Sequence, residues 1–190
     1  MILCDIGNSF FHFYKDGRIW KIPAKENPEI ERGGEKLYFI SVNPQAAKKL
    51  LNKFPDAINL DKFTFLDTNY EGIGIDRAAA CKAIDDGVIV DAGSAITVDV
   101  MQNGMHLGGY ILPGIKEYKR AYENISPALN KNFNFDISKE LLPQNTVDAI
   151  SYGAIISIVT IIEKSVKNKR IYFTGGDGPY MARFFSNGIV

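Results

Sequence analysis

The sequence predicts a mixed α/β protein made of two similar halves, because one order of elements occurs twice. In each half an apolar run ends in an acidic, glycine-containing turn, which is Asp5-Ile6-Gly7-Asn8-Ser9 first and Asp91-Ala92-Gly93-Ser94 later. Each turn precedes two strand-like segments joined by a two-residue turn, Asp16-Gly17 or Asn103-Gly104. Such dipeptides are typical of tight β-hairpins. We therefore expect two mixed α/β halves that face each other across a cleft.

The first half, which we expect over residues 1–75, begins with three strands. These are an apolar run, an aromatic-rich run and an alternating return strand, over residues 2–6, 10–14 and 18–22. Phe10, Phe11, Phe13 and Tyr14 are interpreted as packing residues. Later predicted elements are a polar region with helical character from Asn27-Pro28, a buried strand over 37–42, a helix over 45–52 after Asn43-Pro44, and strands near 57–60 and 63–66.

The second half, expected over residues 76–190, repeats this pattern and adds helices. The predicted elements are helices over 76–84, 115–124 and 146–167, and strands over 88–90, 96–101, 105–112 and 171–173. Residues 130–145 are polar and irregular, and we expect a mobile loop there. The helix over 146–167 carries apolar residues on more than one side, which fits a subunit interface or a central helix within one subunit.

Composition narrows the class of protein. The 190 residues contain 22 Lys plus Arg and 22 Asp plus Glu, so no global charge indicates a nucleic-acid or membrane partner. Cys4 and Cys81 lie in apolar or alanine-rich surroundings, and we interpret them as buried residues in a reducing compartment. The N-terminus has no basic region before Asp5, and no apolar stretch approaches the roughly 18 residues of a membrane helix. We expect a cytoplasmic protein.

The two acidic turns suit a polyphosphate. Gly7 lets backbone N–H groups approach an anion, and Asn8 and Ser9 add short hydrogen-bond donors. Because a carboxylate repels phosphate, Asp5 makes sense beside Mg²⁺, bound directly or through water. For one such motif alone an ordinary β-turn is the simpler interpretation. Its repetition around Asp91 favours two loops that bind one polyphosphate from opposite sides.

A third glycine-rich turn, Thr174-Gly175-Gly176-Asp177-Gly178, follows the last buried strand. Gly175 and Gly176 would let the backbone approach a flat ring or a ribose closely. The chain contains neither the lysine-bearing phosphate loop G-x-x-x-x-G-K-[ST] nor a match to the dinucleotide fingerprint. These absences exclude two common nucleotide-binding classes.

The segment Tyr70-Glu71-Gly72-Ile73-Gly74-Ile75-Asp76-Arg77 offers a second kind of site. Asp76 stands at an expected helix start, where the helix dipole favours a carboxylate. One interpretation is structural: Asp76 caps the helix and Arg77 is solvated on its surface. The functional interpretation makes Asp76 the group that orients a substrate hydroxyl and accepts its proton, with Arg77 binding a carboxylate.

Taken in order, these motifs resemble the acetate and sugar kinase/Hsp70/actin superfamily and, within it, the type III pantothenate kinases. The resemblance spans nearly the whole chain and includes Asp5-Ile6-Gly7-Asn8, Ser41-Val42-Asn43-Pro44, Gly74-Ile75-Asp76-Arg77, Asp91-Ala92-Gly93-Ser94-Ala95-Ile96-Thr97-Val98-Asp99, Gly108-Gly109-Tyr110-Ile111-Leu112-Pro113-Gly114, Asn145-Thr146 and Thr174-Gly175-Gly176-Asp177. It implies two ribonuclease-H-like (actin-like) halves, each a mixed sheet with flanking helices. Ser9 and Ser94 stand where the family commonly has threonine. The family is expected to have a further strand and helix beyond the glycine-rich turn, where this chain ends at Val190.

The resemblance also implies roles for residues. Asp76 matches the proton acceptor, and Asp91 matches a ligand for a monovalent cation, K⁺ or NH₄⁺. The pantothenate contacts it implies are Tyr70, Gly74, Ile75, Asp76, Arg77 and Thr146. The ATP contacts it implies are Asp5, Ile6, Gly7, Asn8, Ser9, Phe10, Phe11, His12 and Ser94, with Gly175 and Gly176 assigned to the nucleotide by their position.

The implied reaction is transfer of the ATP γ-phosphoryl group to the primary hydroxyl of pantothenate, the first step of coenzyme A biosynthesis, by a homodimer that uses Mg²⁺. A non-catalytic ATP-binding regulatory protein, or another small-molecule kinase or phosphohydrolase on the same scaffold, is the alternative. Three further polar residues, His12, His106 and Asp99, are also weighed for a role in the site. His12 and His106 are interpreted as structural from their sequence, although the resemblance places His12 in the first ATP loop. Asp99 is interpreted either as a further acid in the site or as a residue on the wet face of its strand, and we favour the wet face.

Overall fold

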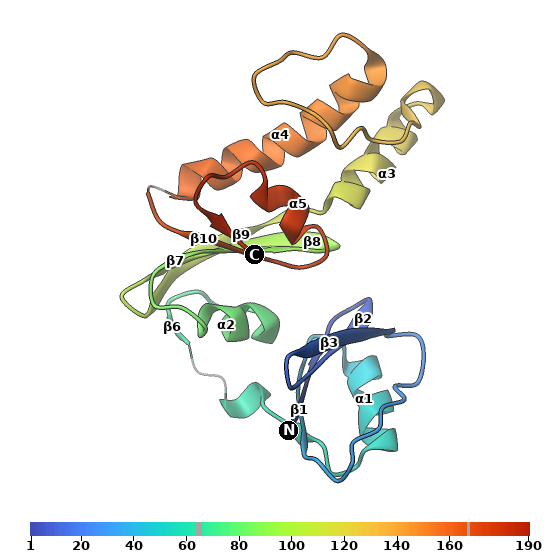
Figure 1. Ribbon diagram of the computed structural model, residues 1–190, viewed down its shortest axis with the longest axis vertical. Helices are drawn as coiled ribbons and strands as arrows, with labels where there is room; N and C mark the ends of the chain where they lie inside the picture. Colours follow the sequence, from blue (N-terminus) through green and yellow to red (C-terminus); the bar gives the residue numbers. More distant parts are fainter. Residues whose placement is uncertain (64–65, 167) are drawn as a thin grey trace. The chain divides into compact units, whose positions relative to one another are not determined.

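The computed structural model describes residues 1–63, 66–166 and 168–190, which form two compact units, Met1–Ala83 and Ile84–Val190 (Figure 1). The two units are called the first and the second unit below. Each contains its own mixed sheet and its own apolar core.

The first unit is built on a five-stranded sheet in the order β3-β2-β1-β4-β5. β1 pairs antiparallel with β2 and parallel with β4, and helix α1 follows β4 (Figure 1). The elements are β1 (Ile2–Ile6), β2 (Phe10–Lys15), β3 (Arg18–Pro23), β4 (Leu37–Ser41), α1 (Pro44–Lys53), β5 (Ile58–Asn59), η1 (Asp61–Phe63), β6 (Asp67–Thr68) and α2 (Ile75–Cys81).

The second unit orders its own strands β9-β8-β7-β10-β11. β7 pairs antiparallel with β8 and parallel with β10, and β10 pairs parallel with β11. The elements are β7 (Gly87–Ala92), β8 (Ala95–Gln102), β9 (Met105–Pro113), α3 (Ile115–Ile125), η2 (Pro127–Leu129), α4 (Thr146–Val166), β10 (Ile171–Thr174), α5 (Gly178–Ala182) and β11 (Gly188–Ile189).

The two strand orders are the same, which confirms the repeat expected from the sequence. Each unit has an antiparallel three-strand meander whose first strand also pairs with a parallel strand. The hairpin turns also correspond. Asp16 and Gly17 have φ of 48° and 82°, and Asn103 and Gly104 have φ of 50° and 76°. Two successive positive φ values define the tight hairpin turn that Asp-Gly and Asn-Gly favour.

Alternation along the strands places the two cores. In β2, Phe11 and Phe13 are fully buried and pack with residues of β1, β4 and α1. In the second unit, residues of β7, β8 and β10 pack beneath α4, whose Ile155, Ile158 and Ile162 are fully buried. The packing role expected for Phe11 and Phe13 is confirmed. Cys4 and Cys81 are buried, as predicted.

Two expected elements of the first unit are not found as predicted over the described part of their ranges. The helical character expected from Asn27-Pro28 is wrong, since the structure has no helix or strand over residues 27–32. Proline lacks the N–H that a helix interior needs, and Gly33 and Gly34, with φ of 58° and 81°, turn the chain. The strand expected over 63–66 lies partly outside the described residues, and Phe63 itself ends a 3₁₀ turn.

Helix α4 is long and apolar enough to span a membrane by length and composition alone, contrary to the expectation that no stretch would approach that length. Such a pattern is also found in core helices of globular proteins. Eight residues of α4 are buried, and five of them pack in one core cluster with residues of β7, β8 and β10: Ile155, Ile158, Val159, Ile162 and Val166. The packing shows that α4 serves as the central helix of that core.

Candidate functional site

The start of α2 holds the Asp76 carboxylate over the first helical turn. Gly74 is the N-cap residue, and Asp76 Oδ1 accepts a hydrogen bond of 2.8 Å from the backbone N–H of Arg77. A Cβ on Gly74 would lie 2.6 Å from Asp76 Oδ1, so any other residue there would force this carboxylate to move. Asp76 is not the N-cap residue, because Gly74 occupies that position, but its side chain does bind a backbone N–H of the first turn, as the structural interpretation expected. The carboxylate still gains from the positive end of the helix dipole.

Arg77 is a buried residue. Its side chain is 6% exposed, and its guanidinium carbon lies 4.8 Å from the centre of the Tyr70 ring. Arg77 Nη1 also donates to Tyr70 Oη at 3.4 Å. The alternative of a solvated Arg77 is therefore wrong. A guanidinium held on an aromatic face is oriented before any ligand arrives.

A cavity of about 560 Å³ lies beside the same helix start. This volume is in the range of small-molecule sites. Its lining is mixed apolar and polar, and it consists of Ser41, Val42, Asp61, Leu66, Thr68, Ile73, Ile75 and Ala78. One of these lining residues, Ile75, is among the residues expected from the sequence to contact the substrate.

Asp61 was missed by the sequence analysis. Its carboxylate accepts hydrogen bonds from Ser41 N at 3.3 Å and from Asn59 Nδ2 at 3.2 Å, which places it in the cavity wall. A lone acid after a two-residue strand gave no signal in the sequence.

The first acidic turn is a tight connection between β1 and β2. Gly7 N donates to Phe10 O at 3.0 Å, and Ala24 N donates to Ser9 O at 2.9 Å. Asp5 lies opposite His12 in the antiparallel pair, and both are exposed. Although the residue as a whole is exposed, partial desolvation of its ring and the nearby Lys21 lower the pKa of His12.

Ile6 and Phe11 do not expose their side chains at this turn. Both are fully buried, so a ligand at the turn could contact them only through the backbone. The turn therefore offers exposed polar groups at Asp5, Asn8 and Ser9 over an apolar base.

The second acidic turn meets the loop before α3. Gly93 N donates to Ala95 O at 3.0 Å, and Gly114 N donates to Ser94 O at 3.1 Å. A Cβ on Gly114 would lie 2.5 Å from Ser94 O and would overlap Gly93 O. The glycine of Pro113-Gly114 therefore permits this close approach, while Ser94 remains exposed.

The glycine-rich turn that follows β10 contacts Asp91 and Ala92, at the end of β7. Gly175 has a φ of 82°, and a Cβ there would overlap Asp91 Oδ1 and lie 2.5 Å from Ala92 O. Asp177 N donates to Ala92 O at 2.9 Å. The second unit thus brings together Asp91, Ser94 and Gly175 at the carboxyl ends of the parallel strands β7 and β10. In open α/β sheets this edge is where ligands bind.

Oxygen donors dominate this edge. The Asp91 carboxylate and the Ala92 carbonyl both face Gly175. Carboxylate and carbonyl oxygens are ligands that hard cations prefer, so these residues are of a type that could hold a cation.

Thr146 is the first residue of α4, and its side chain is exposed. Asn145 precedes it and caps the helix, since Asp148 N donates to Asn145 Oδ1 at 2.9 Å.

Asp99 is not on a wet face, and that expectation is wrong. Its side chain is 2% exposed and lies 2.8 Å from His106 Nε2, which is also buried. The pair links β8 to β9 inside the second unit, and it agrees with the structural interpretation of His106. A buried carboxylate needs such a partner because unpaired burial is costly.

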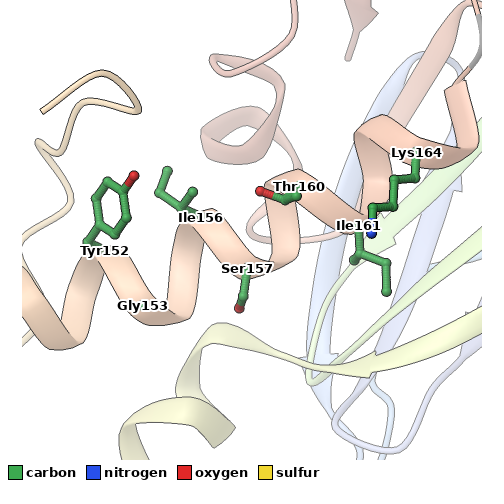
Figure 2. A pocket seen from close by; sticks show the side chains of 7 residues that line it. All are labelled: Tyr152, Gly153, Ile156, Ser157, Thr160, Ile161 and Lys164. Carbon is green, nitrogen blue, oxygen red and sulfur yellow. The ribbon is translucent and has the colours of Figure 1, made fainter. Parts of the chain in front are cut away.

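A second cavity, of about 400 Å³, lies along the outer side of α4 (Figure 2). All its lining residues come from that helix, and they are Tyr152, Gly153, Ile156, Ser157, Thr160, Ile161 and Lys164. Ile161 is 38% exposed, which leaves an apolar side chain on this face.

Comparison with known proteins gives one consistent family. The family described as type III pantothenate kinase matches residues 1–168. A curated type III pantothenate kinase of Wolinella succinogenes is 56% identical over 190 residues, covering 100% of this chain and 90% of the relative. The corresponding protein of Helicobacter hepaticus is 51% identical over 195 residues, covering 100% and 91%.

Solved structures agree on the fold. A Campylobacter jejuni crystal structure, described as a candidate Baf family transcriptional activator, is 43% identical with a TM-score of 0.88 and covers 100% of this chain and 90% of its own. A Sinorhizobium meliloti structure, described as a candidate 2-dehydro-3-deoxygalactonokinase, has a TM-score of 0.55 at 12% identity and covers 96% of this chain and 86% of its own. At that identity the second likeness shows the actin-like sugar kinase fold alone.

Proposed function

Since the chain belongs to the type III pantothenate kinase family and is an ATP-dependent pantothenate kinase of coenzyme A biosynthesis, we propose that its acceptor site is the start of α2. The observations that carry this proposal are the Asp76 carboxylate, held on the backbone N–H of Arg77, and the buried guanidinium of Arg77, which the Tyr70 ring preorients. One group suits a hydroxyl, and the other suits the carboxylate of pantothenate.

Asp76 serves as the proton acceptor. The primary hydroxyl oxygen of pantothenate forms a bond to the γ-phosphorus of ATP, the bond from that phosphorus to the β,γ-bridging oxygen breaks, and ADP leaves. The hydroxyl proton passes to Asp76 Oδ. Phosphoryl transfer depends mostly on positioning and charge neutralisation, so orientation of the hydroxyl is the main contribution of Asp76.

Arg77 binds the pantothenate carboxylate. A planar guanidinium can donate two parallel hydrogen bonds to a carboxylate, and the Tyr70 ring limits its rotation. Tyr70, Gly74 and Ile75 complete the proposed contacts in the first unit, and Thr146 adds one from α4.

The nucleotide contacts come from both acidic turns. In the first turn, the exposed side chains of Asn8 and Ser9 donate hydrogen bonds to phosphate oxygens. The other residues proposed to contact the nucleotide there lie next to these donors along the chain, and they are Ile6, Gly7, Phe10, Phe11 and His12. In the second unit, Ser94, Gly175 and Gly176 supply a hydroxyl and close backbone approach.

Two cations accompany the nucleotide. Asp5 is the proposed ligand of Mg²⁺, directly or through water, and Asp91 the proposed ligand of K⁺ or NH₄⁺. A bound cation supplies positive charge that offsets the phosphate oxygens. Replacing K⁺ by Na⁺ in the assay below should lower turnover if Asp91 holds a potassium-sized ion.

The proposed assembly is a cytoplasmic homodimer that has neither a nucleic-acid nor a membrane partner. The outer side of α4, with Ile161 and the cavity of about 400 Å³, is the face proposed for the subunit contact. The balanced net charge agrees with the lack of a polyanionic partner.

Coupled measurement of ADP release, with and without pantothenate, tests the proposed function against its rivals. A kinase releases ADP only when pantothenate is present. Equal release in both conditions would indicate a phosphohydrolase, and no release in either would indicate a non-catalytic ATP-binding regulator.

A further inference from the structure

Asp148, in the first turn of α4, joins two asparagines that are far apart in sequence. Its Oδ2 accepts a hydrogen bond of 2.6 Å from Asn145 Nδ2, and its Oδ1 accepts one of 2.7 Å from Asn134 Nδ2. These two donors hold the pKa of Asp148 below its usual value. The carboxylate is therefore charged at neutral pH, and charge-assisted hydrogen bonds of this kind are the stronger ones.

A second link ties Asn134 to the same helix. Asn134 N donates to Ser151 Oγ at 2.8 Å, and Ser151 Oγ donates to Val147 O at 2.7 Å. Ser151 is fully buried, so this link is shielded from water. Residues around Asn134 are thus fixed to the first two turns of α4 by both side chain and backbone.

Thr146 lies between the two ends of this network. It follows the cap residue Asn145 and precedes Asp148, and these two exchange a pair of hydrogen bonds across it. The backbone of Thr146 is consequently fixed while its hydroxyl remains exposed. An exposed group on a fixed backbone is well placed to contact a ligand with little loss of entropy.

We propose that Asp148 is a positioning residue for pantothenate binding, which acts by fixing Thr146 through Asn145 and Asn134. The inference rests on the proposed function, in which Thr146 contacts pantothenate. Asp148 itself touches no substrate in this scheme.

The test measures KM for pantothenate, KM for ATP and kcat for Asp148→Ala, Asn134→Ala and Thr146→Val. Each variant should raise KM for pantothenate by about threefold to tenfold, the scale of one lost hydrogen bond, and leave KM for ATP unchanged. The double variant Asp148→Ala/Thr146→Val should be no worse than Thr146→Val alone, because both changes remove one contact.

Two variants separate positioning from general stability. Asp148→Asn keeps one acceptor oxygen and should partly restore KM for pantothenate. Glu163→Ala is the matched control, since Lys139 Nζ donates to Glu163 Oε1 at 2.6 Å and ties the same segment to α4. Glu163 lies about 22 Å further along the helix. Its removal should leave both KM values unchanged.

The outcomes distinguish the inference from its premise. An unchanged KM for pantothenate in Asp148→Ala, while Thr146→Val raises it, overturns the inference and leaves the proposed function standing. A KM effect of Asp148→Ala without one of Thr146→Val, or additive effects in the double variant, also overturns it. Should Asp148→Ala fail to fold, Asn134→Ala is judged by the same criteria. Loss of pantothenate-dependent turnover in the wild type would instead refute the proposed function.

Discussion

At the scale of single residues, Gly175 connects two of the three predicted loops. It has a positive φ, and the space that a Cβ would need is filled by Asp91 Oδ1 and Ala92 O. The turn was predicted from its glycines. Its contact with Asp91 could not be predicted, because the two residues are brought together by the parallel pairing of β10 with β7.

Gly175→Ala should therefore destabilise the protein by more than the cost of placing alanine at a positive φ, because the added Cβ also clashes with its neighbours. Gly17 has the same φ of 82° with nothing within 4 Å of its Cβ position, so Gly17→Ala measures the backbone cost alone. We expect about 1–2 kcal/mol from denaturant unfolding of Gly17→Ala. Gly175→Ala should lose more and should also weaken ATP binding, because Asp91 must move.

Equal destabilisation by the two substitutions, with unchanged ATP affinity, would mean that Gly175 does not support Asp91. Denaturant unfolding and a nucleotide titration of both variants decide this.

Asp99 shows where prediction from the sequence fails. Alternation along β8 predicts which residues share a face, and the strand itself was correctly expected. Alternation does not tell whether a carboxylate on that face has a buried partner. The partner, His106, comes from the next strand, so only the pairing of β8 with β9 brings the two together.

At the scale of elements, the hairpins were the most predictable and the polar connections the least. Asp16-Gly17 and Asn103-Gly104 determine both hairpin turns locally, so no tertiary contact is needed to foresee them. Asn43 and Pro44 likewise start α1 as expected, with Asn43 Oδ1 accepting from Ala46 N. The links from Asn134 to α4 are invisible in the sequence because each joins residues more than ten positions apart.

Helix α4 allows a prediction at this scale. Its inner side packs in the core of the second unit. On its outer side Ile161 is 38% exposed and lines the cavity shown in Figure 2. If this side is the proposed subunit contact, Ile161→Asp should shift sedimentation from dimer to monomer, since burying an unpaired carboxylate is costly. The isolated subunit should keep its thermal midpoint.

Ile19→Asp is the control for that experiment. Ile19 is 75% exposed on β3 in the first unit, and the same substitution there should leave the sedimentation unchanged. A dimer that persists in Ile161→Asp would place the subunit contact elsewhere on the protein.

At the scale of the whole molecule, the repeat of strand order explains why the fold was predictable. The two units use the same arrangement of three antiparallel strands and a parallel neighbour, and the sequence carries the repeat in its acidic turns. The assignment to the family is likewise consistent along the chain, since the curated relatives match all of it. The roles of individual residues are harder to predict from the sequence, because they depend on contacts between segments that are distant along the chain.

The most direct test of the central claim is transfer of labelled γ-phosphoryl from ATP to pantothenate by the wild type and by Asp76→Asn. The wild type should form phosphorylated pantothenate and ADP in equal amounts. Asp76→Asn should lower kcat by at least about 100-fold, with ATP affinity and thermal midpoint unchanged. Asp16→Asn, at a turn whose positive φ asparagine tolerates, is the matched control and should be fully active. Near-normal transfer by Asp76→Asn would contradict the account.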